Sequence, residues 1–242
     1  MADNTYSTIL EQLGFMTAYI DTLDAAKLSL PADLIPAELT ILRTAATGLH
    51  TEVGNKKGDW RTVTLDRTTD ADKLSSMAAQ AVALLQVQGA SDEQIKDARF
   101  YVRKLQGRRA TPAVVDDPAT PDIDESEASI SASQQSNAAK ISHFNELIDF
   151  LEAQPEYASV NNTGFKINEL RAFADSVQAK HQASIVAVVQ LSTARVERDK
   201  VFFNNTDSIL NRAKRIKKAV GAAYGFNSPE FQTVNAFKIQ RP

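Results

Sequence analysis

"INELRAFADSVQAKHQASIVAVVQLSTARVERDKVFF", residues 167–203, contains neither glycine nor proline over 37 residues. Because these two residues interrupt helices most strongly, the stretch predicts one long helix, which at about 1.5 Å per residue would reach roughly 55 Å. Leu170, Val177, Ser184 and Leu191 recur at a spacing of seven, and Ala174, His181, Val188 and Arg195 form a second such row. Each row follows one helix face, and the mixture of apolar and polar residues is typical of the seam of a helical bundle.

The segments before this stretch show the same helical periodicity. Apolar residues at spacings of three and four predict helices over residues 5–26, 36–49, 71–87 and 91–105. Between the second and third of these lies "GNKKGDW", residues 54–60, whose two glycines predict a turn or kink. Ser91 and Gln94 have the spacing of a capping box at the start of the fourth helix. The positions expected to face inward are Ile9, Leu13, Met16, Ile20, Leu23, Leu39, Leu42, Ala46, Leu49, Leu74, Met77, Ala81 and Leu85.

The C-terminal part of the chain continues the pattern. Helices are expected from residue 144 to Pro155 and over residues 206–223, the latter capped by Asn205 or Thr206. Its inward positions would be Ile209, Ala213, Ile216 and Val220. In "GFNSPEF", Gly225 has the backbone freedom that ends a helix, and Ser228 followed by proline suits the start of the next one. We therefore expect a turn between two helices here, and not a binding loop.

A change in composition divides the chain. Residues 107–137 contain three prolines, six acids, five serines and no aromatic residue, which predicts an extended acidic linker. The expected domains are an N-terminal helical bundle of residues 1–106 and a C-terminal helical bundle of residues 138–242. Several residues match between the halves at offsets of 128 to 137, among them His50 with His181, which indicates an internal duplication. The expected fold class is all-α, with two related antiparallel helical bundles and long helices.

Three stretches of the second half carry a resemblance to other proteins: "FNELIDFLEAQPEY" (144–157), "STARVERDKVFF" (192–203) and "AAYGFNSPEFQTVNAFKIQRP" (222–242). On these stretches the chain resembles a group of uncharacterised helical proteins from Bacteroidetes-type bacteria, over roughly residues 140–242. The shared features are the Arg198–Asp199 pair and the later Gly-x-x-Ser-Pro-Glu-aromatic pattern. The resemblance implies an all-helical fold and no particular activity, so it transfers no catalytic residues.

Bulk composition excludes several classes of protein. Without cysteine, the chain has no disulfide, zinc–thiolate site or thiol nucleophile. The first residues lack the basic and apolar regions of a secretory signal. The longest apolar stretch, residues 183–191, is too short to cross a membrane and is expected to be a buried part of a helix. A cytoplasmic protein is therefore expected. The net charge is −3 on residues 1–106, −4 on 107–137 and +4 on 138–242, which favours contact between the halves or between copies.

The three histidines are the first candidates for a site. His50, His143 and His181 are far apart in sequence, and His181 has no carboxylate three or four positions away. A helical metal site supplies its second ligand at that spacing, so no metal site is predicted.

The residues around one turn near the end of the long helix are the second candidate. Arg195, Arg198 and Asp199 are expected to form a structural ion-pair network, with His181 on the same bundle seam. An anion site and a solvated helix face are the alternatives for these charges.

The third candidate is the basic run "RAKRIKK", whose cations Arg212, Lys214, Arg215, Lys217 and Lys218 cover about half of a helix. Such a face could neutralise the phosphates of a nucleic acid. A solvated face, or one that docks on the acidic residues 116–127, would explain the run equally well.

No pattern in the sequence is typical of an enzyme or a cofactor site, since neither a phosphate-binding glycine loop nor a Gly-x-Ser-x-Gly elbow is present. The sequence favours a non-enzymatic structural or scaffold protein that acts through helix-mediated self-association or through contacts with another protein. The alternative is a binding module for an anionic partner, either a nucleic acid or an acidic protein, through residues 212–218.

Overall fold

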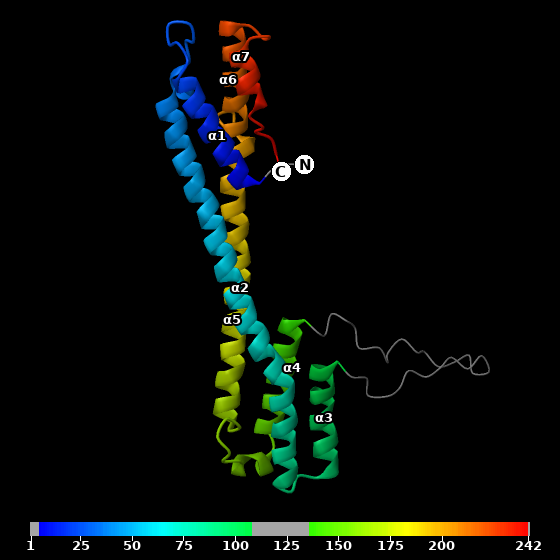
Figure 1. Cartoon of the computed structure of the whole chain (residues 1–242). Coiled ribbons are helices and arrows are strands. Elements are labelled where there is room, and N and C mark those ends of the chain that lie inside the picture. Colours follow the sequence, from blue (N-terminus) through cyan, green and yellow to red (C-terminus); the bar gives the residue numbers. More distant parts are fainter. Residues whose placement is uncertain (1–4, 108–135, 242) are drawn as a thin grey trace, which may run out of the picture. The chain divides into compact units, whose positions relative to one another are not determined.

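The computed structural model describes residues 5–107 and 136–241 of the chain (Figure 1). These residues form helices and no strands, so the expected all-α fold class is confirmed for them. The α-helices are α1 (Tyr6–Asp21), α2 (Pro36–Val87), α3 (Asp92–Gln106), α4 (Asn137–Glu152), α5 (Ile167–Asp199), α6 (Ile209–Tyr224) and α7 (Pro229–Ala236). Two short 3₁₀ helices, η1 (Ala32–Leu34) and η4 (Pro155–Ser159), and one π-helical turn, η5 (Lys200–Asn204), complete the described elements. The linker expected at residues 107–137 lies almost wholly outside the described residues.

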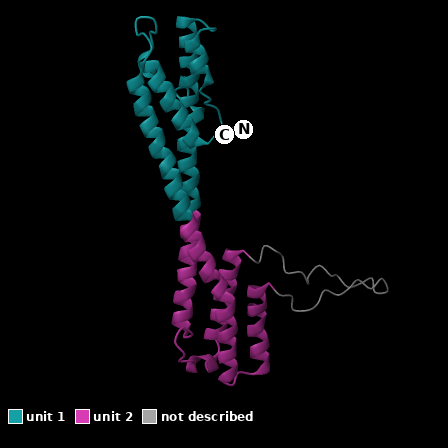
Figure 2. Ribbon diagram, in the orientation of Figure 1, with its two compact units in different colours: residues 1–60, 187–242 teal, residues 61–186 magenta. Residues whose placement is uncertain are grey.

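The chain folds as two compact units, which Figure 2 draws in different colours. Unit 1 comprises Met1–Trp60 and Ala187–Pro242, and unit 2 comprises Arg61–Val186. This division differs from the expected bundles of residues 1–106 and 138–242, because each unit combines segments from both sides of the expected linker. The reason is the length of α2 and α5, each of which supplies residues to both units. The internal duplication stays a prediction.

Helix α2 is continuous over 52 residues, so a turn at residues 54–60 is wrong, and the alternative of a kink stays a prediction. Gly54 and Gly58 are exposed, and nothing lies within 4 Å of a side-chain carbon added at either position. A helical glycine costs only about 1 kcal/mol relative to alanine, which tertiary packing can outweigh. Here Val53 and Trp60 of α2 pack against α5 and supply that packing.

Helices α2 and α5 lie side by side and antiparallel within each unit. In unit 1, the Lys56 ammonium donates to the Gln190 side-chain oxygen at 3.3 Å. In unit 2, the Arg67 guanidinium donates to the Ser184 hydroxyl at 2.8 Å. Residue numbers therefore rise along α2 as they fall along α5. This pairing covers one face of α5 only.

Helix ends follow the expected local signals in most places. Ser91 and Gln94 form the predicted capping box at the start of α3. Gly225 has a φ of +96° after α6, and Phe226 packs back on the last turn of that helix. The Ser228 hydroxyl accepts a hydrogen bond from the N–H of the third residue of α7 at 3.1 Å, as expected for its cap.

The predicted cap of α6 is wrong. Ser208, and not Asn205 or Thr206, caps this helix, because its fully buried hydroxyl accepts the N–H of Asn211. The helix therefore begins three residues later than expected, after a short turn that follows η5.

Each unit has its own apolar core. Unit 2 packs α3 and α4 against parts of α2 and α5, and unit 1 packs α1, α6, α7 and η5 against the other parts. Most of the residues that were expected to face inward on α1, α2 and α6 are buried. They are Ile9, Leu13, Met16, Ile20, Leu39, Ala46, Leu74, Ala81, Leu85, Ile209, Ala213, Ile216 and Val220. Among the described residues, none of the helices combines the length and apolar character that crossing a membrane requires.

Candidate interaction surface

Helix α5 carries apolar residues on two faces. The row Leu170, Val177, Ser184 and Leu191 is buried, as its seven-residue spacing predicts. A second set is between 45% and 59% exposed: Ile185, Val186, Val188, Val189 and Val196. The burial expected for residues 183–191 is therefore wrong for five of its apolar residues: Ala183, Ile185, Val186, Val188 and Val189. The second set, which consists of Ile185, Val186, Val188, Val189 and Val196, is called the α5 apolar face below.

Three residues of the α5 apolar face lie opposite the residues of α5 that pack on α2. At 3.6 residues per turn, Ile185, Val189 and Val196 fall within about 40° of one another around the helix axis. Leu191 and Ala194, which pack with Val53 of α2, lie roughly opposite them. A run of consecutive apolar residues presents more apolar surface than one antiparallel neighbour can cover, so part of it stays exposed.

Four of the five residues of the α5 apolar face lie in an uncharged part of the helix, and the fifth, Val196, lies between Arg195 and Glu197. From His181 to Ala194 there is no Asp, Glu, Lys or Arg. The nearest charged residues are Lys180, which pairs with Asp70, and Arg195, which is exposed. Soluble surfaces normally intersperse charges among exposed apolar residues, and an apolar area without them is typical of a protein–protein contact.

The expected ion pair between Arg198 and Asp199 is present at the end of α5. The Arg198 Nε donates to Asp199 Oδ1 at 2.9 Å, and the Tyr6 hydroxyl donates to the same oxygen at 2.8 Å. The Arg198 guanidinium also lies 3.5 Å from the centre of the Tyr6 ring, a cation–π contact. Burial, followed by the hydrogen bond to Asp199, raises the pKa of Tyr6. This cluster holds the first turn of α1 against the junction of α5 with η5.

Two other members of the expected network lie elsewhere. Arg195 is exposed, and His181 belongs to unit 2, where its Nδ1 is buried without a hydrogen-bond partner among the described residues. The sequence pattern did not identify Tyr6, because it lies 193 positions before Asp199. His50 joins the cluster instead: its ring stacks on that of Tyr6 at 5.8 Å.

The environment of His50 predicts a pH dependence for unit 1. Burial first, and the nearby Arg198 charge second, hold the pKa of His50 below its ordinary value of 6.5. The unfolded chain therefore binds a proton that the folded chain does not. The contribution of neutral His50 to the stability of unit 1 is fully present above pH 6.5 and is lost as the pH falls through that value toward the folded pKa.

Urea unfolding at about pH 7.5 and about pH 5.5 measures this effect, since histidine is the group that titrates in this range. Trp60, the only tryptophan, packs in unit 1 and reports on its unfolding by fluorescence. We expect a lower midpoint at the acid pH and a smaller difference for His50→Gln. An equal difference in both chains would contradict the role of His50.

Three of the five cations of the basic run make internal bonds. Arg212 donates to the Asp33 carbonyl oxygen and Arg215 to the Asp33 carboxylate, both at 2.5 Å. The Lys217 ammonium donates to the Phe237 carbonyl at 2.7 Å, and burial lowers its pKa. Lys214 and Lys218 are exposed. The cations of this helix therefore mainly fix η1 and the segment after α7.

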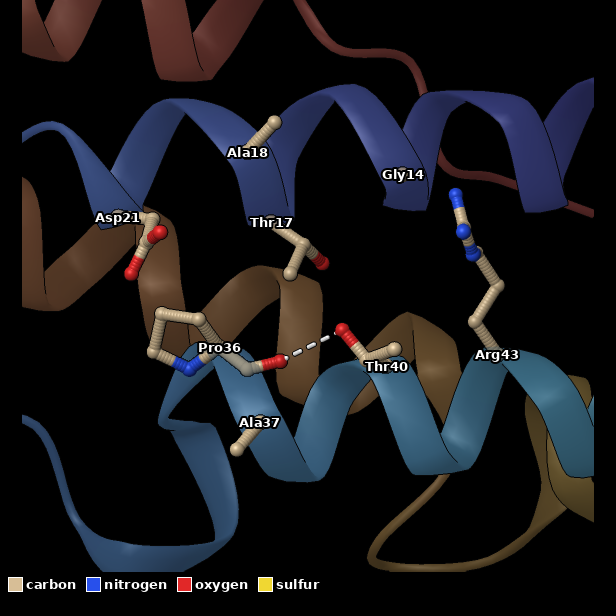
Figure 3. Close-up of a pocket in the computed structure, with 8 residues that line it drawn as sticks. All are labelled: Gly14, Thr17, Ala18, Asp21, Pro36, Ala37, Thr40 and Arg43. Atoms are coloured by element: carbon tan, nitrogen blue, oxygen red, sulfur yellow. Dashed lines mark hydrogen bonds between the residues drawn. The ribbon is translucent and has the colours of Figure 1, made fainter.

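A hollow of about 450 Å³ lies between α1 and the start of α2 (Figure 3). Its lining consists of Gly14, Thr17, Ala18, Asp21, Pro36, Ala37, Thr40 and Arg43. The Thr17 and Thr40 hydroxyls donate to the carbonyls of Leu13 and Pro36, at 2.8 and 2.9 Å. Neither hydroxyl therefore donates to a base that would make it a nucleophile. The hollow has one guanidinium, of Arg43, and one carboxylate, of Asp21, at opposite ends.

Metal-binding side chains do not gather in the described residues, where no three His, Asp or Glu residues could hold one ion. Comparisons with protein-family models, with curated proteins and with solved structures give no match. The proposal below therefore rests on the residues of this chain alone.

Proposed function

We propose that this chain is a non-enzymatic structural or scaffold protein that self-associates through the α5 apolar face. One observation supports the proposal: five apolar residues are about half-exposed on one helix, and four of them lie in the stretch from His181 to Ala194, which carries no charge. Isolated exposed apolar residues are normal on soluble proteins, whereas a group of them without charges is typical of a contact surface.

A second copy of the chain is the partner that this face fits. In a symmetric contact each residue meets the same face of the other copy, so a charged face would repel itself. The α5 apolar face avoids this repulsion because it has no charged member. It also offers nothing that would select a charged partner by electrostatic complementarity. The alternative, an anionic partner at residues 212–218, retains only Lys214 and Lys218 without internal bonds.

The expected affinity is low. Covering a half-exposed valine or isoleucine contributes about 1 kcal/mol, half of the usual value for full burial. The five side chains of each of two copies would then contribute about 10 kcal/mol in total. The loss of translational and rotational freedom on association costs about 4–15 kcal/mol. We therefore expect a dissociation constant in the micromolar range or weaker, strengthened where several copies assemble together.

Replacing Val189 by glutamate is expected to weaken self-association at least about tenfold, because it removes apolar area and brings like charges together. Sedimentation equilibrium from about 10 µM to about 1 mM would measure this change over the expected affinity range. Val189 is 59% exposed, so the fold of the single chain should be unaffected.

Val87→Glu is the matched control, since Val87 is 78% exposed and lies at the end of α2, away from the α5 apolar face. This variant should associate like the unmodified chain. Because the contact is apolar, association should also persist at about 0.5 M salt, where surface charges are screened. A strictly monomeric chain at all these concentrations would contradict the proposal.

A further inference from the structure

We propose that the hollow between α1 and the start of α2 binds a short linear ω-amino acid, with the ligand's carboxylate on Arg43 and its ammonium at Asp21 (Figure 3). All of the lining residues belong to unit 1, and the site needs no second copy of the chain. The site is therefore separate from the proposed self-association. Its volume of about 450 Å³ falls within the range of about 300–1,000 Å³ in which proteins bind small molecules.

Small residues leave this space open and fix the distance between its two charged ends. Gly14 and Asp21 are seven residues apart on α1, so they lie on the same face of that helix and about 10 Å apart along its axis. The Arg43 guanidinium lies directly over Gly14, because a side-chain carbon added at that glycine would overlap it. The guanidinium and the Asp21 carboxylate are therefore about 10 Å apart along the hollow.

Both charged groups are free to bind a ligand. Neither the Arg43 guanidinium nor the Asp21 carboxylate forms a hydrogen bond or an ion pair with another described residue, and both residues are exposed. Glu11 and Arg43 also line a second hollow of about 380 Å³ between the same helices. One positive group thus has a negative group on each side. A simple anion would meet two like charges here, whereas a ligand that also carries an ammonium would not.

The polar groups between the two ends favour an ammonium as well. The Thr17 and Thr40 hydroxyls already donate to helix carbonyls, so only their lone pairs remain for a ligand. Figure 3 shows both hydroxyls between Arg43 and Asp21. An ammonium has three donors and no acceptor, which fits these oxygens and the Asp21 carboxylate. A carboxylate accepts two parallel hydrogen bonds from a guanidinium, which fits Arg43.

The length of the hollow selects among zwitterions. Charge-assisted hydrogen bonds occupy about 2.8 Å at each end, which leaves about 4–5 Å between the ligand's ammonium and its carboxylate. The two groups of an α-amino acid are only about 2.5 Å apart, because a single carbon separates them. An ω-amino acid of three or four carbons has the matching length. Because most of the lining is exposed, we expect a dissociation constant in the millimolar range.

Titration of the whole chain with γ-aminobutyrate tests the proposal, with the backbone amide chemical shifts followed by nuclear magnetic resonance at constant salt. We expect saturable shifts at Gly14, Ala18 and Ala37 below about 50 mM ligand. Butyrate lacks the ammonium and butylamine lacks the carboxylate. Each should bind at least about tenfold more weakly, because it loses one set of charge-assisted hydrogen bonds. Glycine, which is too short to reach both ends, should bind as weakly as butyrate.

Variants of the lining residues test the assigned roles. Arg43→Gln and Asp21→Asn should each raise the dissociation constant at least about tenfold. Gly14→Ala should weaken binding without loss of stability, because the added carbon displaces the guanidinium while alanine favours the helix. Glu52→Gln is the matched control, since this exposed carboxylate lies on α2 outside the hollow. Its removal should leave binding unchanged.

Three outcomes would overturn the proposal. The first is the absence of saturable shifts up to about 50 mM ligand. The second is equal binding of butyrate and γ-aminobutyrate, which would show that the ammonium is not recognised. The third is a dissociation constant that Arg43→Gln leaves unchanged, or that Glu52→Gln raises as much as Asp21→Asn does. Each of these outcomes leaves the proposed self-association untouched, since that is measured by sedimentation and involves other residues.

Discussion

Replacing Gly58 by proline is expected to lower the free energy of unfolding by about 3–4 kcal/mol. Gly58 lies in the interior of the continuous helix α2. Proline there has no N–H to donate to the carbonyl four residues earlier, and its ring collides with that carbonyl. A turn at residues 54–60, as the two glycines suggest, would accommodate proline at far smaller cost. The substitution therefore separates a continuous helix from a kinked one.

Urea denaturation followed by far-UV circular dichroism measures this loss. Gly58→Ala is the matched control, because nothing lies within 4 Å of the added side-chain carbon. Alanine restricts the unfolded chain and favours the helix, so this variant should be more stable by about 0.5–1 kcal/mol. A proline variant as stable as the unmodified chain would show that α2 is interrupted in solution.

Replacing Phe202 by alanine is expected to cost about 3–5 kcal/mol of stability in unit 1. Phe202 lies in the π-helical turn η5 and is 0% exposed. Its ring packs T-shaped against the Tyr6 ring, with the two ring centres 5.1 Å apart, and its centre lies 5.8 Å from that of Phe203. Alanine would leave a cavity at the place where η5, α1 and the Arg198–Asp199 pair come together.

Trp60 fluorescence and circular dichroism during urea unfolding would measure the loss in unit 1. Phe15→Ala is the matched control, since Phe15 lies on α1 and is 50% exposed. Its replacement should cost less than about 1 kcal/mol, because little buried area is lost. Equal costs for the two phenylalanines would contradict the packing of η5 described above.

Local signals in the sequence predicted helix ends and inward faces well. Helix caps contact only residues a few positions away, so they can be predicted from sequence spacing. The examples are Ser91 with Gln94, Gly225 and Ser228. Apolar rows such as Leu170, Val177 and Leu191 are buried because a helix presents the same face every seven residues.

Two of the failed predictions depended on a contact that lies far away in sequence. Gly54 and Gly58 indicate a turn only if no tertiary contact stabilises the helix around them. Val53 and Trp60 of this part of α2 pack against Leu191 and Ala194 of α5, and this contact stabilises the helix. The basic run appeared free for an anion because Asp33, which bonds Arg215, lies 182 positions earlier.

The sequence shows where the apolar residues of α5 lie but not which of them are exposed. Consecutive apolar residues such as Val188 and Val189 predict burial when the number of neighbouring helices is unknown. Only the fold shows that one neighbour, α2, packs on one side of this part of α5. The exposed side is therefore a property of the tertiary structure, and so is the candidate interaction surface built on it.

The way the two units divide the chain also sets an order of events during synthesis. Unit 2 is one uninterrupted stretch, Arg61–Val186, whereas unit 1 joins Met1–Trp60 to Ala187–Pro242. A ribosome makes the N-terminal residues first, and domains generally fold as their residues emerge. Unit 2 can therefore fold while the chain is still growing. Ile9, Leu13 and Met16 share their core with Leu39 and Ala46, which are made early, and with Phe202, Ile209 and Ile216, which are made late. The core of unit 1 can therefore be completed only after α6 has left the ribosome.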